Sequence, residues 1–369
     1  MTGIVSPTEA LVALNLLPKI GPVRVRRLLA AFGDPASILG APMDKLRRVE
    51  GIGGETAKIL HSWEDHADPI AEIQEAQQRG ISIVTQDDED YPAPLQDAYD
   101  PPLLFYVWGK IEPRDRHAIG VVGSRRATTY GLQATKKISY QLAHSGFTII
   151  SGLARGIDTA AHEAAVAANG RTIAVIGSGL GKLYPPENIG LAEKIASGFG
   201  AVVSEFPLHT SPDRQTFPMR NRIVAAWSRA LLVTECPLWS GSLITANLAA
   251  EYGKPIFAVP GPIDKPTSAG CHQLIRDGAT LVADASHLLD DLGELPFARP
   301  SVVEEMPESA PELPEEEALV YAAVTSDETP VDRLIERTGL PAHTVTATLM
   351  KLEMRRLIRA FPGFRYARR

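Results

Sequence analysis

Short apolar runs alternate with segments of helical periodicity through the central part of the chain. The first run, Ala118 to Val122, ends on Gly123-Ser124-Arg125, and the next segment repeats apolar residues at Leu132, Ile138 and Leu142. This spacing predicts a strand, a loop and a helix. The unit recurs at FTIISG, RTIAVIGSG, AVVSEFP, ALLVTECP and PIFAVPG, and a last run, TLVAD, follows. Strands that are apolar throughout need helices on both faces, so the pattern predicts an α/β fold with a doubly wound parallel sheet.

The pattern before residue 110 is different. The pattern of residues 7 to about 65 indicates short helices. One arrangement of turns and apolar positions occurs twice in this region, in LPKIGPVRVRRLLAAFG and in LRRVEGIGGETAKILHSW. They resemble a pair of helix-hairpin-helix motifs, whose glycine turns either approach DNA phosphates or only pack helices together. The second copy has Gly51-Ile52-Gly53, whereas the first has Lys19 at the leading glycine position. Residues 78–110 carry two strand-like runs around an acidic DDED loop, which predict the lead-in strands of the sheet and a solvated turn.

The chain after residue 295 changes composition twice. Residues 296–317 are rich in Pro and Glu and have little to bury, which predicts a linker. Residues 318–369 hold three helical patterns and a glycine hairpin, an order that resembles a winged helix-turn-helix and would suit either DNA or a protein partner. The predicted domains are therefore a helical domain (1–75), the sheet domain (76–295), the linker and the winged-helix-like domain.

The net charge of −7 is misleading because the acidic residues are concentrated in one run. Residues 301–317 contain seven glutamates and no lysine or arginine, and the 37 Lys and Arg residues match the acidic residues outside that run. Local patches must therefore decide whether a nucleic acid binds. No apolar run is long enough for a membrane span, and no export signal is visible. Cys236 and Cys271 fit no metal or redox spacing, so we expect buried free thiols and a cytoplasmic protein.

Glycine, serine and basic residues gather where the predicted strands end. Ligands of doubly wound sheets bind beyond the carboxyl ends of the strands, and free N–H groups at helix starts attract anions. Arg220, Asn221 and Arg222 stand together at a helix start, where the helix dipole disfavours cations, so we expect them to serve an anion. The candidate positions at the strand ends are Gly123, Ser124, Arg125, Gly152, Arg155, Gly156, Ser240, Gly241 and Ser242.

Several alternative sites are weaker. GSGLGK at 177–182 is one residue too short for a P-loop and lacks its Ser or Thr, and Lys182 also breaks the dinucleotide fingerprint, so neither ATP nor NAD is supported. Asp158 and His162 fall on one helix face. They either form a charged pocket floor or act as a helix cap and a packed histidine, and the second interpretation is favoured. A third metal ligand with suitable spacing is missing, so no metal is predicted.

Seven motifs in order carry a family resemblance: GSRRATTYG, SGLARGIDTAAH, AVIGSGL…YPPEN, SEFP, FPMRNRI, SGSLITA and VPGPIDKPTSAGCHQLIRDGA. Together they look like the DNA-processing protein A (DprA/Smf) family over about residues 78–290. The resemblance implies an extended Rossmann-like fold that binds single-stranded DNA, forms a homodimer and helps load the recombinase RecA in natural transformation. It implies no enzyme activity and no cofactor. It points to Arg125, Arg220, Arg222 and Lys254 as phosphate contacts. Pro186 stands where some members have lysine, so Lys182 is a candidate replacement.

The main alternative is a nucleotide phosphoribohydrolase of the lysine-decarboxylase-like group, which resembles this fold. That group carries a Pro-Gly-Gly-x-Gly-Thr-x-x-Glu loop where this chain has Trp-Ser-Gly-Ser-Leu-Ile-Thr-Ala at 239–246. The glutamate of that loop is absent, which disfavours the enzyme. A protein-binding scaffold would leave the arginines at the strand ends unexplained.

Overall fold

The computed structural model describes residues 6–293, 314–325, 329–355, 357–361 and 363–368. These residues divide into two compact units, which precede and follow the segment 294–313 in the sequence. In the described part of the chain, no helix has both the length and the apolar character needed to cross a membrane. The predicted linker falls mostly outside the described residues.

The first unit is built on a nine-stranded sheet of order β1-β2-β6-β5-β4-β3-β7-β8-β9. Its strands are β1 (Ile81–Thr85), β2 (Leu104–Gly109), β3 (Ala118–Val122), β4 (Thr148–Ser151), β5 (Thr172–Val175), β6 (Gly200–Ser204), β7 (Ala230–Val233), β8 (Ile256–Ala258) and β9 (Thr280–Leu281). The seven strands from β6 to β9 are parallel, with Ile119 paired to Ile149 on one side and to Ala230 on the other. The predicted doubly wound parallel sheet is thus confirmed. The two lead-in strands extend it in antiparallel fashion at the β6 edge.

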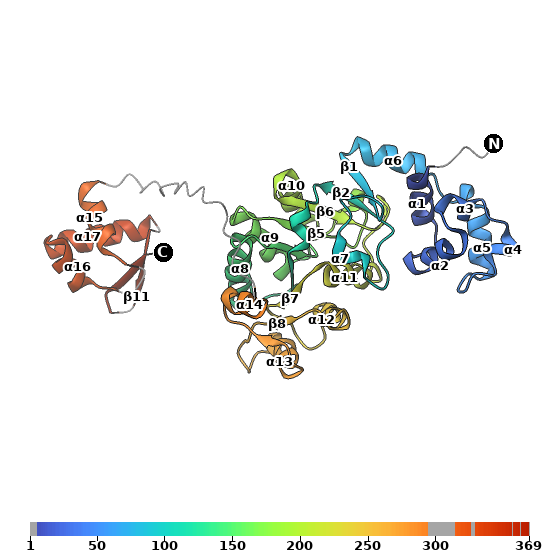
Figure 1. The fold of residues 1–369 in the computed structure, drawn as a ribbon. Coiled ribbons are helices and arrows are strands. Elements are labelled where there is room, and N and C mark those ends of the chain that lie inside the picture. The colour runs from blue at the N-terminus through green and yellow to red at the C-terminus, as the bar shows by residue number, and fades with distance from the viewer. Residues whose placement is uncertain (1–5, 294–313, 326–328, 356, 362, 369) are drawn as a thin grey trace. The chain divides into compact units, whose positions relative to one another are not determined.

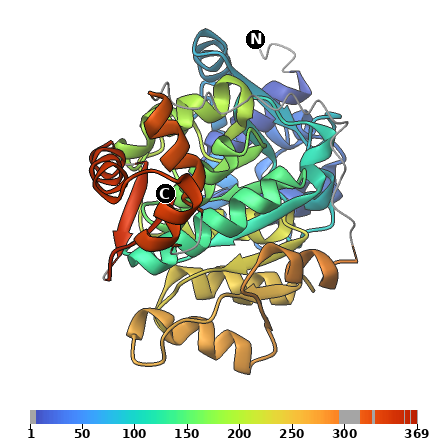
Figure 2. The same cartoon turned by 90° about the vertical axis from the view of Figure 1, so that its left-hand side faces the viewer.

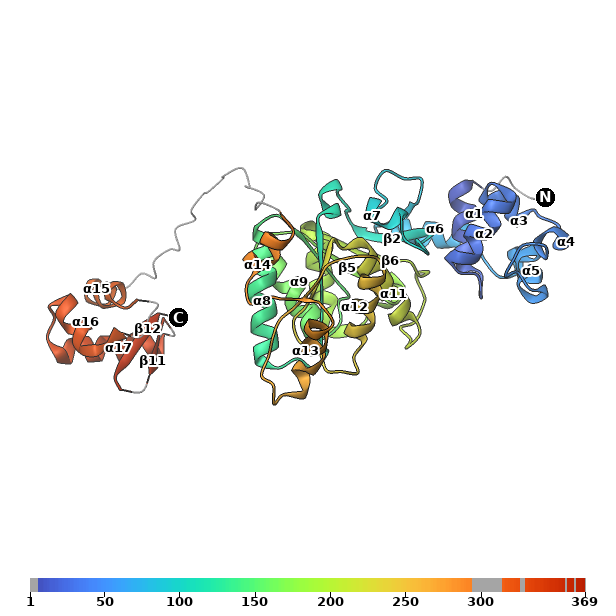
Figure 3. The ribbon, with the colours of Figure 1, turned by 60° about the horizontal axis from the view of Figure 1, so that its bottom comes forward.

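Helices cover both faces of this sheet, as the apolar strands require (Figures 1 and 3). One face packs against α8 (Thr129–His144), α9 (Ile157–Ala167) and α14 (Ala285–Asp291). The other packs against α11 (Thr216–Trp227), α12 (Gly241–Glu251) and α13 (Ala269–Arg276), with Trp227 completely buried. Figure 2 shows α12 and α13, in gold and orange, together at one end of the sheet. The two layers fix where each inter-strand loop emerges.

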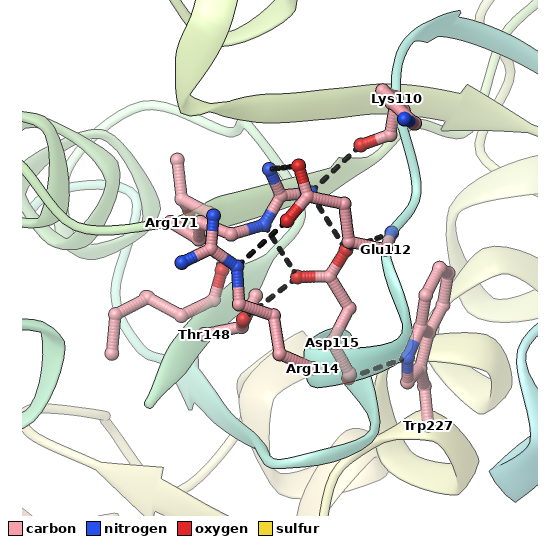
Figure 4. A network of polar contacts seen from close by, with 9 residues as sticks. Lys110, Glu112, Arg114, Asp115, Thr148, Arg171 and Trp227 are labelled. Atoms are coloured by element: carbon pink, nitrogen blue, oxygen red, sulfur yellow. Dashed lines mark hydrogen bonds and ion pairs between the residues drawn. The ribbon is translucent and has the colours of Figure 1, made fainter. Parts of the chain in front are cut away.

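A buried ion pair ties together the amino ends of the central strands (Figure 4). Arg171, just before β5, donates to both carboxylate oxygens of Asp115, at 2.8 and 2.7 Å. Asp115 precedes β3 and also accepts from the Thr148 hydroxyl at 2.8 Å, while its carbonyl accepts from the indole of Trp227 at 3.1 Å. Because both charges are paired and hydrogen-bonded, their burial is tolerated. The network therefore joins the starts of β3, β4 and β5 at the amino edge of the sheet.

The amino-terminal helices repeat one turn geometry. They are α1 (Pro7–Leu16), α2 (Pro22–Phe32), α3 (Pro35–Leu39), α4 (Met43–Leu46), α5 (Gly54–His61) and α6 (Pro69–Gln78). Gly51, before α5, has φ = 82°, and Lys19 has φ = 65° before α2, so lysine adopts the left-handed backbone expected of glycine and pairs with Glu55 at 2.6 Å. Leu11 and Val12 of α1 pack in the cluster under β2 and β6. The predicted boundary at residue 75 lies within α6.

The second unit is a small winged-helix arrangement. It contains α15 (Glu315–Ala323), α16 (Val331–Thr338), α17 (Ala342–Met354) and a three-stranded antiparallel sheet of β10 (Thr329–Pro330), β11 (Ile358–Phe361) and β12 (Arg365–Arg368). Val320, Leu334 and Leu349 are completely buried in its core. The helix α15 begins at Glu315, inside the predicted linker. Glu317 is buried there and pairs with Arg355 at 2.8 Å.

Candidate nucleic-acid interface

A pocket of about 710 Å³ opens at the carboxyl ends of β3 and β7. The strand β3 lies between β4 and β7 in the sheet, so the chain order reverses at this point. Such a switch point is where open α/β sheets bind ligands. The pocket is lined by Val122, Gly123, Ser124, Arg125, Arg126, Ala154, Asp158, Arg214, Phe217, Pro218, Arg220, Asn221, Pro237, Ser240, Gly241, Ser242, Ile244, Thr245 and Thr267.

The loop after β3 is hydrogen-bonded to Glu235, which follows the neighbouring strand β7. The N–H of Ser124 donates to the carbonyl of Glu235 at 2.7 Å, and the Ser124 hydroxyl accepts from the N–H of Arg126 at 3.1 Å. The carboxylate of Glu235, itself buried, accepts from the N–H of Thr128 at 3.0 Å and from the Thr128 hydroxyl. Arg125, in contrast, is exposed and lies 4.7 Å above the ring of Phe217. A hydrogen-bonded backbone with an exposed guanidinium suits anion binding.

Two of the predicted glycines make room for this arrangement and do not line the pocket. A Cβ atom at Gly152 would overlap the guanidinium of Arg220, and one at Gly156 would overlap the carbonyl of Ser124. Gly156 also has φ = 79°, a backbone conformation that favours glycine. Both glycines therefore act by letting charged and backbone groups approach closely.

Arg220 lies in the pocket wall and is almost fully buried, at 4% exposure. Its guanidinium donates to the carbonyl of Val175, while its Nε has no hydrogen-bond partner among the described residues. Burial lowers the pKa of Arg220 to about 10, an effect that Asp158 opposes and Arg125 reinforces. The side chain stays charged at neutral pH, and an anion in the pocket would supply the missing partner.

The amino terminus of α12 faces the same pocket. Ser240 is its N-cap residue, and Ser240, Gly241 and Ser242 all line the cavity. The first N–H groups of a helix have no partner within it, and the helix dipole favours negative charge there. The Ser240 hydroxyl is buried beside the thiol of Cys236. The pocket thus combines helix N–H groups with arginines.

Four predicted basic residues do not reach the pocket. Arg155 is exposed and pairs with Glu187 at 2.6 Å, and Lys182 is exposed outside the lining. Arg222 lies two residues after Arg220 and therefore points elsewhere on the helix; it is buried between Glu205 and Asp100, whose Oδ2 lies 3.0 Å from its Nε. The structure gives Arg222 two carboxylates in place of the expected anionic ligand. Lys254 follows α12 and precedes β8, so it lies at the opposite edge of the sheet.

The pocket also contains residues that the sequence patterns did not single out. Arg126, Arg214 and Phe217 line it beside Arg125. Arg126 could have been found, because it follows the GSR motif directly. Arg214 and Phe217 come from the long loop between β6 and α11 and from the first turn of α11, and only the folded chain brings them to β3. The pocket lining thus carries four arginines and one acidic residue, Asp158.

Asp158 and His162 have mainly structural partners. Asp158 accepts from the N–H groups of Gly152 and Ala154 at 3.1 and 3.3 Å; the cap of α9 is Gly156, so Asp158 does not cap the helix as expected. The ring of His162 is buried and lies 2.6 Å from the Thr172 hydroxyl, which confirms a packed, hydrogen-bonded histidine. Burial lowers its pKa to about 3. Among the described residues, no cluster of side chains could hold a metal ion.

Comparison with known proteins identifies three matching family models. Residues 82–293 match the DNA recombination-mediator protein A model, residues 304–363 the DprA winged helix domain and residues 12–61 a SAM-like helix-hairpin-helix tandem. Protein Smf of Synechocystis sp. is 36% identical over 95% of this chain and 96% of its own length. Protein Smf of Escherichia coli is 41% identical over 76% of each chain.

Solved structures agree with these matches. DNA processing protein A from Streptococcus pneumoniae superposes with a TM-score of 0.66 at 32% identity, covering 77% of this chain and 98% of that one. A structure from Helicobacter pylori, which describes the single-stranded DNA binding mode of its DNA processing protein A, gives a TM-score of 0.51 at 29% identity over 57% of this chain and 95% of that one.

Proposed function

Because the chain belongs to the DNA recombination-mediator protein A family, we propose that it binds single-stranded DNA in the arginine pocket at the carboxyl edge of its sheet. The arginine pocket is the cavity lined by Arg125, Arg126, Arg214 and Arg220 together with the start of α12. The excess of positive charge in this pocket is the main observation that supports DNA binding there. Four arginines against one buried carboxylate favour a polyanion, and helix N–H groups and guanidinium groups are typical phosphate ligands. Such contacts read the backbone and carry no base code, so weak sequence preference is expected.

The position of Arg220 favours a single strand over a duplex. This arginine is almost completely buried in the pocket wall, so a phosphate must enter the cavity to reach it. A single strand can bend its backbone into a cavity, whereas duplex DNA is stiff over about 150 base pairs. The Helicobacter pylori relative binds single-stranded DNA, which is consistent with this choice.

We further propose that binding serves recombination without catalysis. The mediator would hold single-stranded DNA, as a homodimer in the cytoplasm, and help load RecA during natural transformation. The one acidic residue of the pocket lining, Asp158, is buried and accepts two backbone N–H groups, so it is badly placed to act as a base on a nucleotide. This disfavours the phosphoribohydrolase alternative.

The test of this function combines binding and filament formation. Fluorescence anisotropy of a labelled oligo(dT) should rise with the wild-type chain and much less with Arg220→Ala. Arg114→Ala is the matched control, because Arg114 is exposed near the opposite edge of the sheet and pairs with Glu112. RecA nucleation on single-stranded DNA should quicken with the wild type and with the control. Equal binding by all three chains would contradict the proposed site, and hydrolysis of ATP or nucleoside monophosphates that depends on Arg220 would contradict the non-enzymatic role.

A further inference from the structure

Trp239 is an unusually exposed tryptophan. Its exposure is 97%, whereas Trp227 is completely buried and Trp63 and Trp108 are partly buried. Tryptophan carries a large apolar surface and is normally well buried in a folded domain. Packing within the described unit therefore gives no reason for an indole at this position.

The backbone on both sides of Trp239 is anchored. Before it, the carbonyl of the buried Cys236 accepts from the N–H of Gly270 at 2.9 Å. After it, the carbonyl of Ser240 accepts from the N–H of Leu243 at 3.2 Å as α12 begins. The loop between these anchors is short, so it presents the indole to solvent from a fixed base.

This loop also borders the arginine pocket. Pro237 and Ser240 line the cavity, while Trp239 between them does not. Trp239 therefore stands beside the pocket, two residues before Gly241, where α12 begins. A strand whose phosphates enter the pocket would pass this position with its bases turned away from the arginines.

We propose that Trp239 is the stacking platform for a nucleobase of the bound single strand, an inference that rests on the proposed DNA binding. Proteins that bind single strands combine a basic groove for the backbone with aromatic side chains for the bases, and stacking tolerates any base because each has a π-face. The pocket supplies the first element and Trp239 the second. A protein partner is a weaker occupant, since specific protein interfaces cover about 800 Å² per partner and the pocket beside this loop is strongly basic.

The test compares oligo(dT) with an abasic oligonucleotide of the same length and charge, using the full chain. We expect oligo(dT) to quench the tryptophan emission of the wild type and the abasic strand to quench it little. Trp239→Phe should abolish the quenching but keep most of the affinity. Trp239→Ala should weaken oligo(dT) binding by about 5- to 150-fold. It should leave abasic binding and the salt dependence unchanged, because no charge is lost. Ile263→Ala, which removes another exposed apolar side chain (94% exposed), is the control and should change nothing.

Each other outcome is decisive. If the wild type does not bind oligo(dT), the proposed function fails and this inference fails with it. If the wild type binds but Trp239→Ala binds equally well, only the inference fails. Equal weakening of oligo(dT) and abasic binding would show a structural role, and a change in oligomer mass without a change in DNA affinity would assign Trp239 to a protein interface. Either result overturns the stacking platform.

Discussion

Replacing Arg125 with alanine separates a binding role from a folding role. Arg125 is exposed, and its side chain packs on the ring of Phe217, whose centre lies 4.7 Å from the guanidinium carbon. An exposed cation–π contact contributes about 0.5–1 kcal/mol, so the free energy of unfolding should fall by no more than that. The loop itself should keep its shape, because the Ser124 and Thr128 contacts to Glu235 do not involve the Arg125 side chain.

The loss of DNA affinity should be larger. A hydrogen bond to a charged group is worth about 1.5–3 kcal/mol, which corresponds to roughly a ten- to hundredfold weaker Kd. Removing one phosphate contact should also reduce the slope of log K against log salt by ~0.7. Arg125→Lys keeps the charge but loses the planar fork, so its affinity should lie between wild type and alanine. Anisotropy titrations over a salt series measure both quantities.

Arg222→Ala is the contrasting variant on the neighbouring helix. Its side chain forms ion pairs with Glu205 and Asp100, and breaking a buried ion pair typically costs about 3–5 kcal/mol. We expect a large drop in Tm and an unchanged salt slope for the protein that remains folded. A strong drop in Tm for Arg125→Ala without a change in the salt slope would contradict a phosphate contact, because Arg125 would then only brace its loop.

Three further predictions concern a glycine beside the pocket, a buried histidine and the domain boundaries. Gly152→Ala should displace the Arg220 guanidinium and weaken oligo(dT) binding at least about tenfold, because a charged hydrogen bond of about 1.5–3 kcal/mol is lost. Gly190→Ala is the control and should not weaken binding, because an added Cβ atom there would contact no neighbouring atom. His162 has a pKa of about 3 in the fold against about 6.5 unfolded, so the unfolded chain takes up the extra proton and stability should fall as pH drops from 6.5 towards 3. Urea denaturation at pH 7 and 4.5 should show that the free energy of unfolding falls by about 2–3 kcal/mol between these pH values. The fall should be smaller in His162→Gln. A fall of the same size in the variant would contradict this role of His162. Endoproteinase Glu-C should cut first within the glutamate-rich residues 304–312, and mass spectrometry of the fragments would detect this. The helix α1 should remain in the same fragment as the sheet, because Leu11 and Val12 are buried against it. Early release of residues 1–75 would contradict this prediction.

The sheet and the place of the candidate pocket could be predicted because they depend on local patterns. Each buried strand is a continuous apolar run, and the loops after β3 and β7 carry glycine and serine in the sequence itself. Parallel strands bring such loops to one edge, so Ser124 and Ser240 line one pocket although they lie far apart in the sequence.

The partners of single charged side chains could not be predicted in the same way. Arg220 and Arg222 look equivalent in FPMRNRI, but only the fold shows that Asp100 and Glu205 lie beside one of them. Arg214 reaches the pocket through an irregular loop, which has no periodicity to analyse. Only the family resemblance points to Lys254, although its place after α12 already puts it at the other edge of the sheet.

The most direct test of the arginine pocket is a comparison of single- and double-stranded DNA of equal length under matched salt. We predict tighter binding of the single strand, with a slope of log K against log salt of about −2 to −3 if three or four arginines each contact a phosphate. Arg220→Ala should make that slope shallower. Equal or tighter binding of the duplex, or a slope that stays the same in Arg220→Ala, would contradict the binding of single-stranded DNA in the arginine pocket.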